Sequence, residues 1–94
     1  MAIYKLNAQA DEDLARLYER GVILYGLDAA DRYYEQLVDR FCDLAKNPNL
    51  WQAVDYIRAG YRRSVFASHS IYYRIEGEDV LIMRILGRED SNTL

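Results

Sequence analysis

Apolar residues follow two different periods along the chain, and the change falls near residue 50. Between residues 8 and 46 they recur every three or four positions, the spacing of one face of a helix. After Trp51 they recur at every second position, the spacing of a strand with one buried face. The pattern therefore predicts helices in the first half of the chain and a sheet in the second half.

The first half is predicted to contain one short strand and two helices. Residues 3–6 tolerate β structure, and Asn7 suits a helix N-cap because its side-chain oxygen can accept from free amides of the first turn. Gly26 is the predicted end of the first helix, and Asp28 the predicted cap of the second. The second helix should end near Pro48, because proline cannot continue the hydrogen-bond ladder. So short a link between helices predicts an antiparallel hairpin.

The second half is predicted to form three strands, at residues 61–67, 70–75 and 79–86, with a further short edge strand at 56–57. Their short links predict an antiparallel meander. The last strand is apolar on both faces, so it should lie centrally. We expect one α+β domain over residues 1–94, a two-layer sandwich with a sheet of three or four strands. The pattern does not place the first strand in that sheet.

Composition excludes several classes of protein. The chain has 94 residues, 51% of them hydrophobic, which suits one small domain. Cys42 is its single cysteine and His69 its single histidine, so we expect no internal disulfide, metal centre or cofactor. No apolar run approaches the ~20 residues of a membrane span, and the start lacks a signal-peptide core. We therefore expect a cytoplasmic protein without membrane contact.

Charge is distributed unevenly. The net charge is −3, yet four arginines and no acid lie between Tyr56 and Ile75. The overall balance argues against direct, sequence-specific binding of nucleic acid, so the basic region should meet a protein. Either Arg62 or Arg63 is expected to pair with a helix acid such as Asp39 or Asp43.

The most distinctive run is Ile57-Arg58-Ala59-Gly60-Tyr61-Arg62-Arg63, followed by Ser68-His69 and Ile71-Tyr72-Tyr73-Arg74. It is accompanied by Tyr4-Lys5-Leu6 before Ala10-Asp11-Glu12-Asp13-Leu14, by Tyr25-Gly26, Ala29-Ala30 and Tyr33, by Asn47-Pro48, and by Ile82-Met83-Arg84-Ile85-Leu86-Gly87-Arg88. Taken together over nearly the whole chain, these stretches resemble the ParE branch of the RelE/ParE toxin superfamily from bacterial toxin–antitoxin operons.

The resemblance implies a toxin that is neutralised by direct binding of a ParD-like antitoxin, in a toxin–antitoxin hetero-oligomer. Members of the ParE branch characteristically inhibit DNA gyrase and so block replication. Members of the RelE branch instead cleave messenger RNA on the ribosome. A toxin that only binds gyrase would need no active site of its own.

The chemistry of the sheet favours the first branch. RNA cleavage needs a proton acceptor, a proton donor and cations for the phosphate. The last lysine is Lys46, so the sheet offers arginines, which hold their protons at any relevant pH. His69 falls in a predicted tight turn without an obvious partner, and the acids Glu89 and Asp90 would repel a phosphate. A messenger-RNA-cleaving toxin and a non-toxic antitoxin-binding relative stay open as alternatives.

Candidate contact residues are therefore surface residues, with none assigned to catalysis. Arg74 and Arg84 lie on facing strands and are expected to line one sheet face that receives polar antitoxin residues. The helix hairpin should supply an apolar groove that includes Leu24 and Val38. The full set predicted to bind antitoxin or target is Arg58, Arg62, Arg63, Arg74, Arg84 and Arg88, with Leu17, Tyr18 and Tyr34 of the hairpin.

Overall fold

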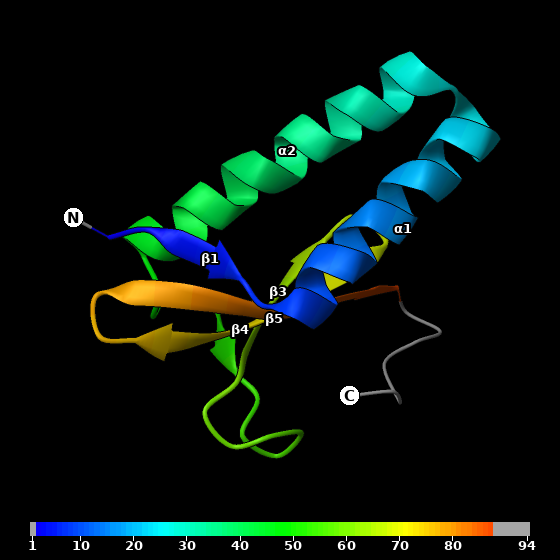
Figure 1. The fold of residues 1–94 in the computed structure, drawn as a ribbon. Helices are drawn as coiled ribbons and strands as arrows, with labels where there is room; N and C mark the ends of the chain where they lie inside the picture. Colours follow the sequence, from blue (N-terminus) through cyan, green and yellow to red (C-terminus); the bar gives the residue numbers. More distant parts are fainter. Residues whose placement is uncertain (1, 88–94) are drawn as a thin grey trace.

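The computed structural model describes residues 2–87 as two layers, a helix hairpin over one face of a sheet (Figure 1). The predicted α+β sandwich is confirmed. The elements in chain order are β1 (Tyr4–Leu6), α1 (Ala8–Tyr25), α2 (Leu27–Lys46), β2 (Gln52–Ala53), β3 (Arg62–Phe66), β4 (His69–Glu76) and β5 (Asp79–Gly87).

The sheet has five strands in the order β1-β5-β4-β3-β2. The predicted meander is confirmed, because β3, β4 and β5 pair antiparallel and β5 has a neighbour on each side. β1 completes the β5 side by pairing parallel to it, with Tyr4 opposite Val80. The edge strand expected at residues 56–57 is wrong: these residues lie in a loop, and Gln52–Ala53 pairs with β3 instead.

One glycine serves both helices. The Asn7 side chain accepts from the amide of Ala10 at 2.8 Å, so the predicted N-cap of α1 is confirmed. Gly26 ends α1 with φ 93°, and the same residue is the N-cap of α2. The prediction that Asp28 caps α2 is therefore wrong. Asp28 lies in the first turn, where the helix dipole still favours its charge.

The main core lies between the helices and the sheet. α2 contributes Leu37, Phe41 and Leu44, which pack against Ile71 and Tyr73 of β4 among other strand residues. A smaller cluster lies on the other face of the sheet and consists of Val54, Tyr61, Tyr72 and Leu86. The residues between Val54 and Tyr61 form a loop on the side of the sheet away from the helices (Figure 1). The sheet is thus covered on one face by helices and partly on the other by this loop.

Tyr73 should make the fold less stable at alkaline pH. Burial raises the pKa of its phenol above the usual 10.0, and the hydroxyl donates to the carbonyl of Pro48 at 2.6 Å. The folded chain therefore keeps this proton longer than the unfolded chain does. The contribution of Tyr73 to the free energy of unfolding should be fully present below pH ~10, and it should be lost as the pH rises through the pKa of the folded state.

The variant Tyr73→Phe should lose about 1 kcal/mol at pH 8, because the hydrogen bond to Pro48 is removed. Between pH 8 and 10.5 the free energy of unfolding should fall less in the variant than in wild type. A smaller decline should remain in the variant, because burial also raises the pKa values of Tyr4 and Tyr33. Urea unfolding of both proteins at the two pH values measures this, and equal declines would contradict the assignment to Tyr73.

Candidate functional site

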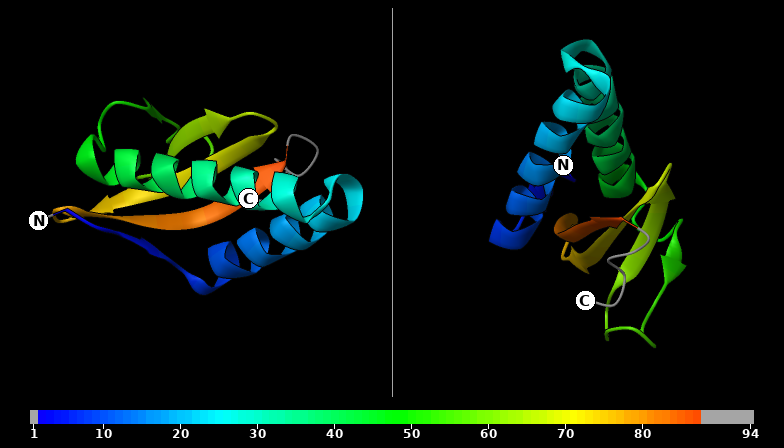
Figure 2. Two further views of the ribbon diagram at one scale, coloured as in Figure 1. Left: turned by 90° about the horizontal axis from the view of Figure 1, so that it is seen from above. Right: turned by 90° about the vertical axis from the view of Figure 1, so that its right-hand side faces the viewer.

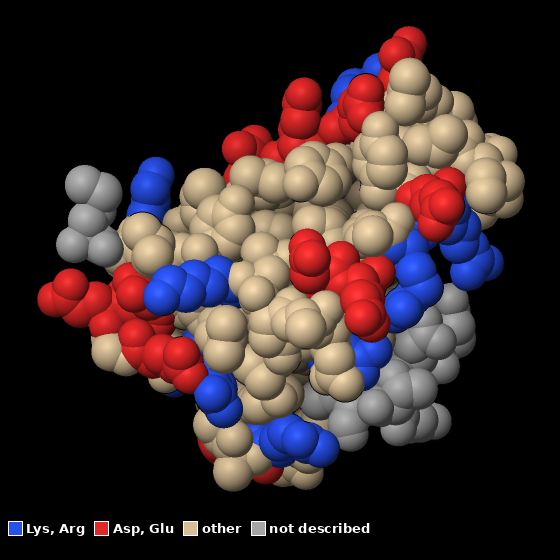
Figure 3. Space-filling view, viewed as in Figure 1, with Lys and Arg blue, Asp and Glu red and all other residues tan. Residues whose placement is uncertain are grey.

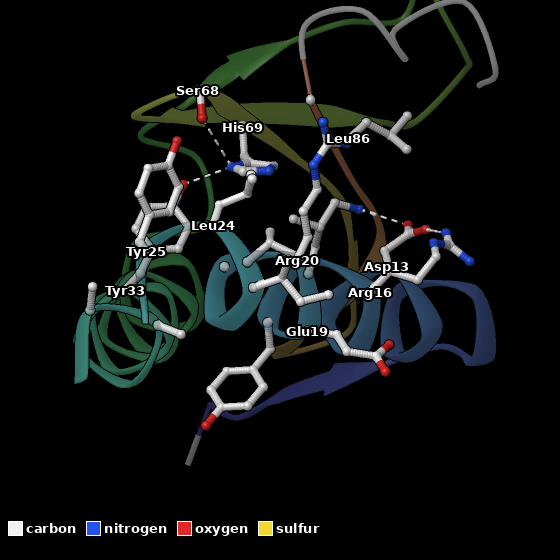
Figure 4. Close-up of a pocket in the computed structure, with 18 residues that line it drawn as sticks. Asp13, Arg16, Glu19, Arg20, Leu24, Tyr25, Tyr33, Ser68, His69 and Leu86 are labelled. Carbon is white, nitrogen blue, oxygen red and sulfur yellow. Dashed lines mark hydrogen bonds and ion pairs between the residues drawn. The ribbon is translucent and has the colours of Figure 1, made fainter. Parts of the chain in front are cut away.

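The tip of the helix hairpin rises away from the sheet (Figures 1 and 2). This divergence leaves an open cavity of about 790 Å³ between α1, the start of α2 and the ends of β4 and β5 (Figure 4). We call it the hairpin groove. Its lining is largely apolar and includes Leu17 and Leu24 from α1 and Ile85 and Leu86 from β5.

The hairpin tip exposes large apolar side chains beside this groove. Ile23 is 79% exposed, Leu24 56% and Tyr25 76%, and all three line the groove. Leu27 at the start of α2 is also exposed. A soluble chain rarely leaves so many large apolar side chains together in water, unless another molecule covers them. The groove and tip therefore have the character of a protein-binding surface.

Asp13 forms the polar end of the groove and is buried, although it carries a charge. Its carboxylate accepts from Arg84 Nε at 2.8 Å, from the amide of Ile85 at 3.0 Å and from Arg16 at 2.5 Å. β1 pairs with β5 only as far as Ile82, so the amide of Ile85 lies beyond the reach of that strand. Asp13 thus supplies the acceptor that a longer β1 would have provided.

Tyr33 and His69 close the groove on the side of α2. The Tyr33 hydroxyl lies 2.7 Å from His69 Nδ1, and Ser68 lies beside them (Figure 4). Burial raises the pKa of Tyr33. The prediction that His69 lacks a partner in a tight turn is wrong, because the residue begins β4 and bonds to α2. Sequence reasoning missed this pair and Asp13, since 36 and 71 positions separate the partners.

Of the predicted hairpin residues, Leu17 and Tyr18 line the groove and Leu24 does as well. The Tyr18 hydroxyl donates to Asp31 at 2.5 Å, which ties α1 to α2. Tyr34 does not line the groove, and its ring packs edge to face against the ring of Tyr18, with the centroids 5.9 Å apart. Val38 is half-buried and packs against the main core, away from the groove lining.

The predicted pairing of Arg62 or Arg63 with a helix acid is wrong. Arg62 donates to the carbonyl of Trp51 at 2.6 Å, and a hydrogen bond to the Tyr72 hydroxyl raises the pKa of Arg63. The helix residue that reaches this strand is Arg40, which donates to Ser64 Oγ at 2.6 Å. The side chain that α2 directs toward β3 is thus a guanidinium and not a carboxylate.

The structure does not bring Arg74 and Arg84 into one site. Arg74 donates to Glu76 on its own strand at 2.6 Å, whereas Arg84 bonds to Asp13 on α1. Each guanidinium therefore has its own carboxylate. Arg58 lies on the loop below the sheet, over the ring of Tyr61 at 5.8 Å. Arg88 lies outside the described residues.

Residues 2–87 contain no group of three or more His, Cys, Asp or Glu side chains that could hold a metal ion. Within the same residues, no helix combines the length and the apolar character that crossing a membrane requires. Arg16 and Arg20 line the hairpin groove beside its apolar residues. Arg20 points from α1 toward the β5 side of the groove (Figure 4).

Comparison with known proteins identifies the family. Residues 4–92 match the family described as the ParE toxin of the type II toxin–antitoxin system parDE. Toxin ParE1 of Mycobacterium tuberculosis is 32% identical over 84 residues, which cover 88% of this chain and 86% of that protein. Toxin ParE1 of Caulobacter vibrioides is 33% identical over 86 residues, which cover 92% and 88%.

Two solved structures share the fold. A chromosomal ParDE system from P. aeruginosa has a TM-score of 0.80 at 24% identity, covering 93% of this chain and 96% of that chain. The RelBE2 toxin–antitoxin complex from Mycobacterium tuberculosis has a TM-score of 0.68 at 21% identity, covering 92% and 96%. At these identities the likeness concerns the fold alone. The match over residues 4–92, with the ParE1 relatives, establishes that this chain belongs to the ParE toxins of type II toxin–antitoxin systems.

Proposed function

We propose that this toxin inhibits DNA gyrase by binding, without an active site of its own, and that a ParD-like antitoxin neutralises it from the hairpin groove. The observation that carries the antitoxin part is the groove itself, with its exposed apolar rim of Ile23, Leu24 and Tyr25. A cover of matching character would stabilise the toxin and make the pair soluble.

The groove suits an amphipathic segment that orders on binding. Its apolar lining fits one face of a helix, in the mode by which helices dock into grooves. Arg16 and Arg20 line the same groove and are exposed, so acidic residues at the edge of the antitoxin segment would complement them. We expect an antitoxin segment with apolar residues at helical spacing and acids beside them.

Inhibition by binding, and not RNA cleavage, is supported by the state of the sheet arginines. Arg62 bonds to a backbone carbonyl, Arg74 to Glu76 and Arg84 to Asp13. These partners hold the cations that would otherwise neutralise a scissile phosphate. Tyr33 and His69, which also line the groove, are bonded to each other at 2.7 Å.

The experiment combines purified toxin with gyrase, relaxed plasmid and ATP, with and without the cognate antitoxin. We expect loss of supercoiling or accumulation of linear plasmid, and reversal by an equimolar amount of antitoxin. A parallel sample of messenger RNA on translating ribosomes should stay intact.

A mock preparation from cells that do not express the toxin, purified in the same way, serves as the control for contaminating nuclease. If gyrase supercoils the plasmid normally in the presence of a toxin that still binds its antitoxin, gyrase is not the target. Cleaved transcripts under those conditions would move the chain to the RNA-cleaving alternative.

A further inference from the structure

We propose a second interaction surface, on the β2–β3 loop, which binds an acidic surface of the toxin's protein target. The β2–β3 loop comprises residues 54–61 and lies on the side of the sheet away from the helices (Figure 1). This inference rests on the proposed function, because it assigns the surface by which the toxin acts. It is separate from the hairpin groove, to which no residue of the loop contributes.

The loop has a defined shape, held by hydrogen bonds. The amide of Val54 donates to the carbonyl of Tyr61 at 2.8 Å, and the carbonyl of Val54 accepts from Ile57 at 2.8 Å. Asp55 Oδ1 accepts from the amide of Gly60 at 2.8 Å, and Gly60 takes a φ of 81° that favours glycine. A loop fixed in this way loses little conformational entropy when a partner binds.

Both ends of the loop are buried, whereas its middle is exposed to solvent. Val54 and Tyr61 are buried in the smaller cluster with Tyr72. Between them Tyr56 is 73% exposed, and Ile57 and Arg58 are exposed as well. Arg58 lies over the ring of Tyr61 at 5.8 Å and Tyr56 is hydrogen-bonded to Arg63, so these two side chains are held in place while they remain exposed. Tyrosine and arginine on a rigid support are the residues that most often dominate a protein interface.

The charge around the loop identifies the character of the partner. No acid lies between Tyr56 and Ile75, where Arg58 and Arg63 are found, and the carboxylate of Asp55 is bonded to Gly60. On the visible face, acidic side chains lie over α1, over α2 and at the β4–β5 turn, whereas basic ones predominate along the lower side (Figure 3). An acidic protein surface with an apolar recess for Tyr56 complements this arrangement.

Substitutions on the loop test the proposal through growth arrest, which does not presuppose the target. The toxin is expressed without antitoxin as wild type, Tyr56→Ala, Arg58→Ala and Arg58→Glu. Tyr56→Ala should lower toxicity at least about tenfold, measured as the inducer dose for half arrest. Arg58→Glu should lower it more than Arg58→Ala, because a reversed charge is repelled by an acidic partner. Unchanged arrest by all three variants would overturn the proposal.

Antitoxin affinity and stability separate loss of a contact from loss of the fold. Each variant should bind the cognate antitoxin within about twofold of wild type, because the hairpin groove is intact. Leu50→Ala, at an exposed residue outside both surfaces, is the matched control and should stay fully toxic. Variants that lose antitoxin binding and arrest together would place the effect in folding and overturn the assignment.

Two further arms keep this proposal distinct from the proposed function. If wild type arrests growth without inhibiting gyrase in vitro, the gyrase proposal fails. The loop variants then still test whether the β2–β3 loop binds the target. If purified wild type binds duplex DNA alone and Arg58→Ala removes that binding, the partner is nucleic acid and the protein-surface proposal is overturned. Wild type that arrests nothing overturns both.

Discussion

Replacing Asp13 with alanine is expected to lower the free energy of unfolding by about 3–5 kcal/mol. The Asp13 carboxylate is 2% exposed and accepts hydrogen bonds from Arg84, Arg16 and the amide of Ile85. Removing it takes the buried partner from Arg84, whose side chain is 20% exposed. It also leaves the buried Ile85 amide without the acceptor that Asp13 supplies, a loss of about 1–3 kcal/mol by itself.

Chemical unfolding of wild type and Asp13→Ala, followed by circular dichroism, measures the change. Glu12→Ala is the matched control, because Glu12 is the exposed acid one position earlier on the same turn of α1. Its effect should stay within about 0.5 kcal/mol. A variant Asp13→Ala as stable as Glu12→Ala would mean that the carboxylate does not hold α1 to β5. A domain of this size has about 5–15 kcal/mol in total, so the predicted loss is a large share of it.

The variant Leu24→Glu is expected to weaken antitoxin binding about 100-fold, or ~3 kcal/mol. Leu24 lines the hairpin groove and is 56% exposed in the free chain, so a bound antitoxin would bury it further. Burying a leucine contributes about 1.5–3 kcal/mol, and a carboxylate in its place would have to lose its water without a partner. The folded toxin should tolerate the change, because the side chain already stands largely in water.

Titration calorimetry with the cognate antitoxin gives the affinity, and thermal unfolding checks the fold. Leu50→Glu introduces the same charge at a residue that is 71% exposed and outside the groove, so its affinity should equal that of wild type. Should Leu24→Glu bind as tightly as Leu50→Glu, the antitoxin does not use the hairpin groove. Toxicity of Leu24→Glu should persist in cells even when antitoxin is co-expressed.

Elements with a local cause were predictable from the sequence. The Asn7 cap, the end of α1 at Gly26 and the antiparallel meander each follow from a few neighbouring residues, and the structure contains all of them. The central position of β5 followed as well, because both faces of that strand are apolar. The cap of α2 at Asp28 was predicted wrongly, because local preference could not reveal that Gly26 caps both helices.

The candidate site was only partly predictable. Leu17, Tyr18 and Leu24 reach the hairpin groove because helical spacing fixes which residues share a face. The pairing of Arg62 or Arg63 with a helix acid was predicted wrongly, because the type of a residue gives its charge and does not identify its partner. Arg84 meets an acid 71 positions away on α1, and Arg62 meets a backbone carbonyl that no pattern of side chains could indicate.

The sequence by itself thus determined the elements, their hairpin and meander connections, and the resemblance to ParE toxins, because these depend on neighbours along the chain. Only the tertiary structure decided where β1 pairs, which groups meet at Asp13 and His69, and that the β2–β3 loop lies on the side of the sheet away from the helices. Such contacts join residues far apart in sequence. They are selected by packing of the whole chain, in which each strand edge and buried charge must find a partner.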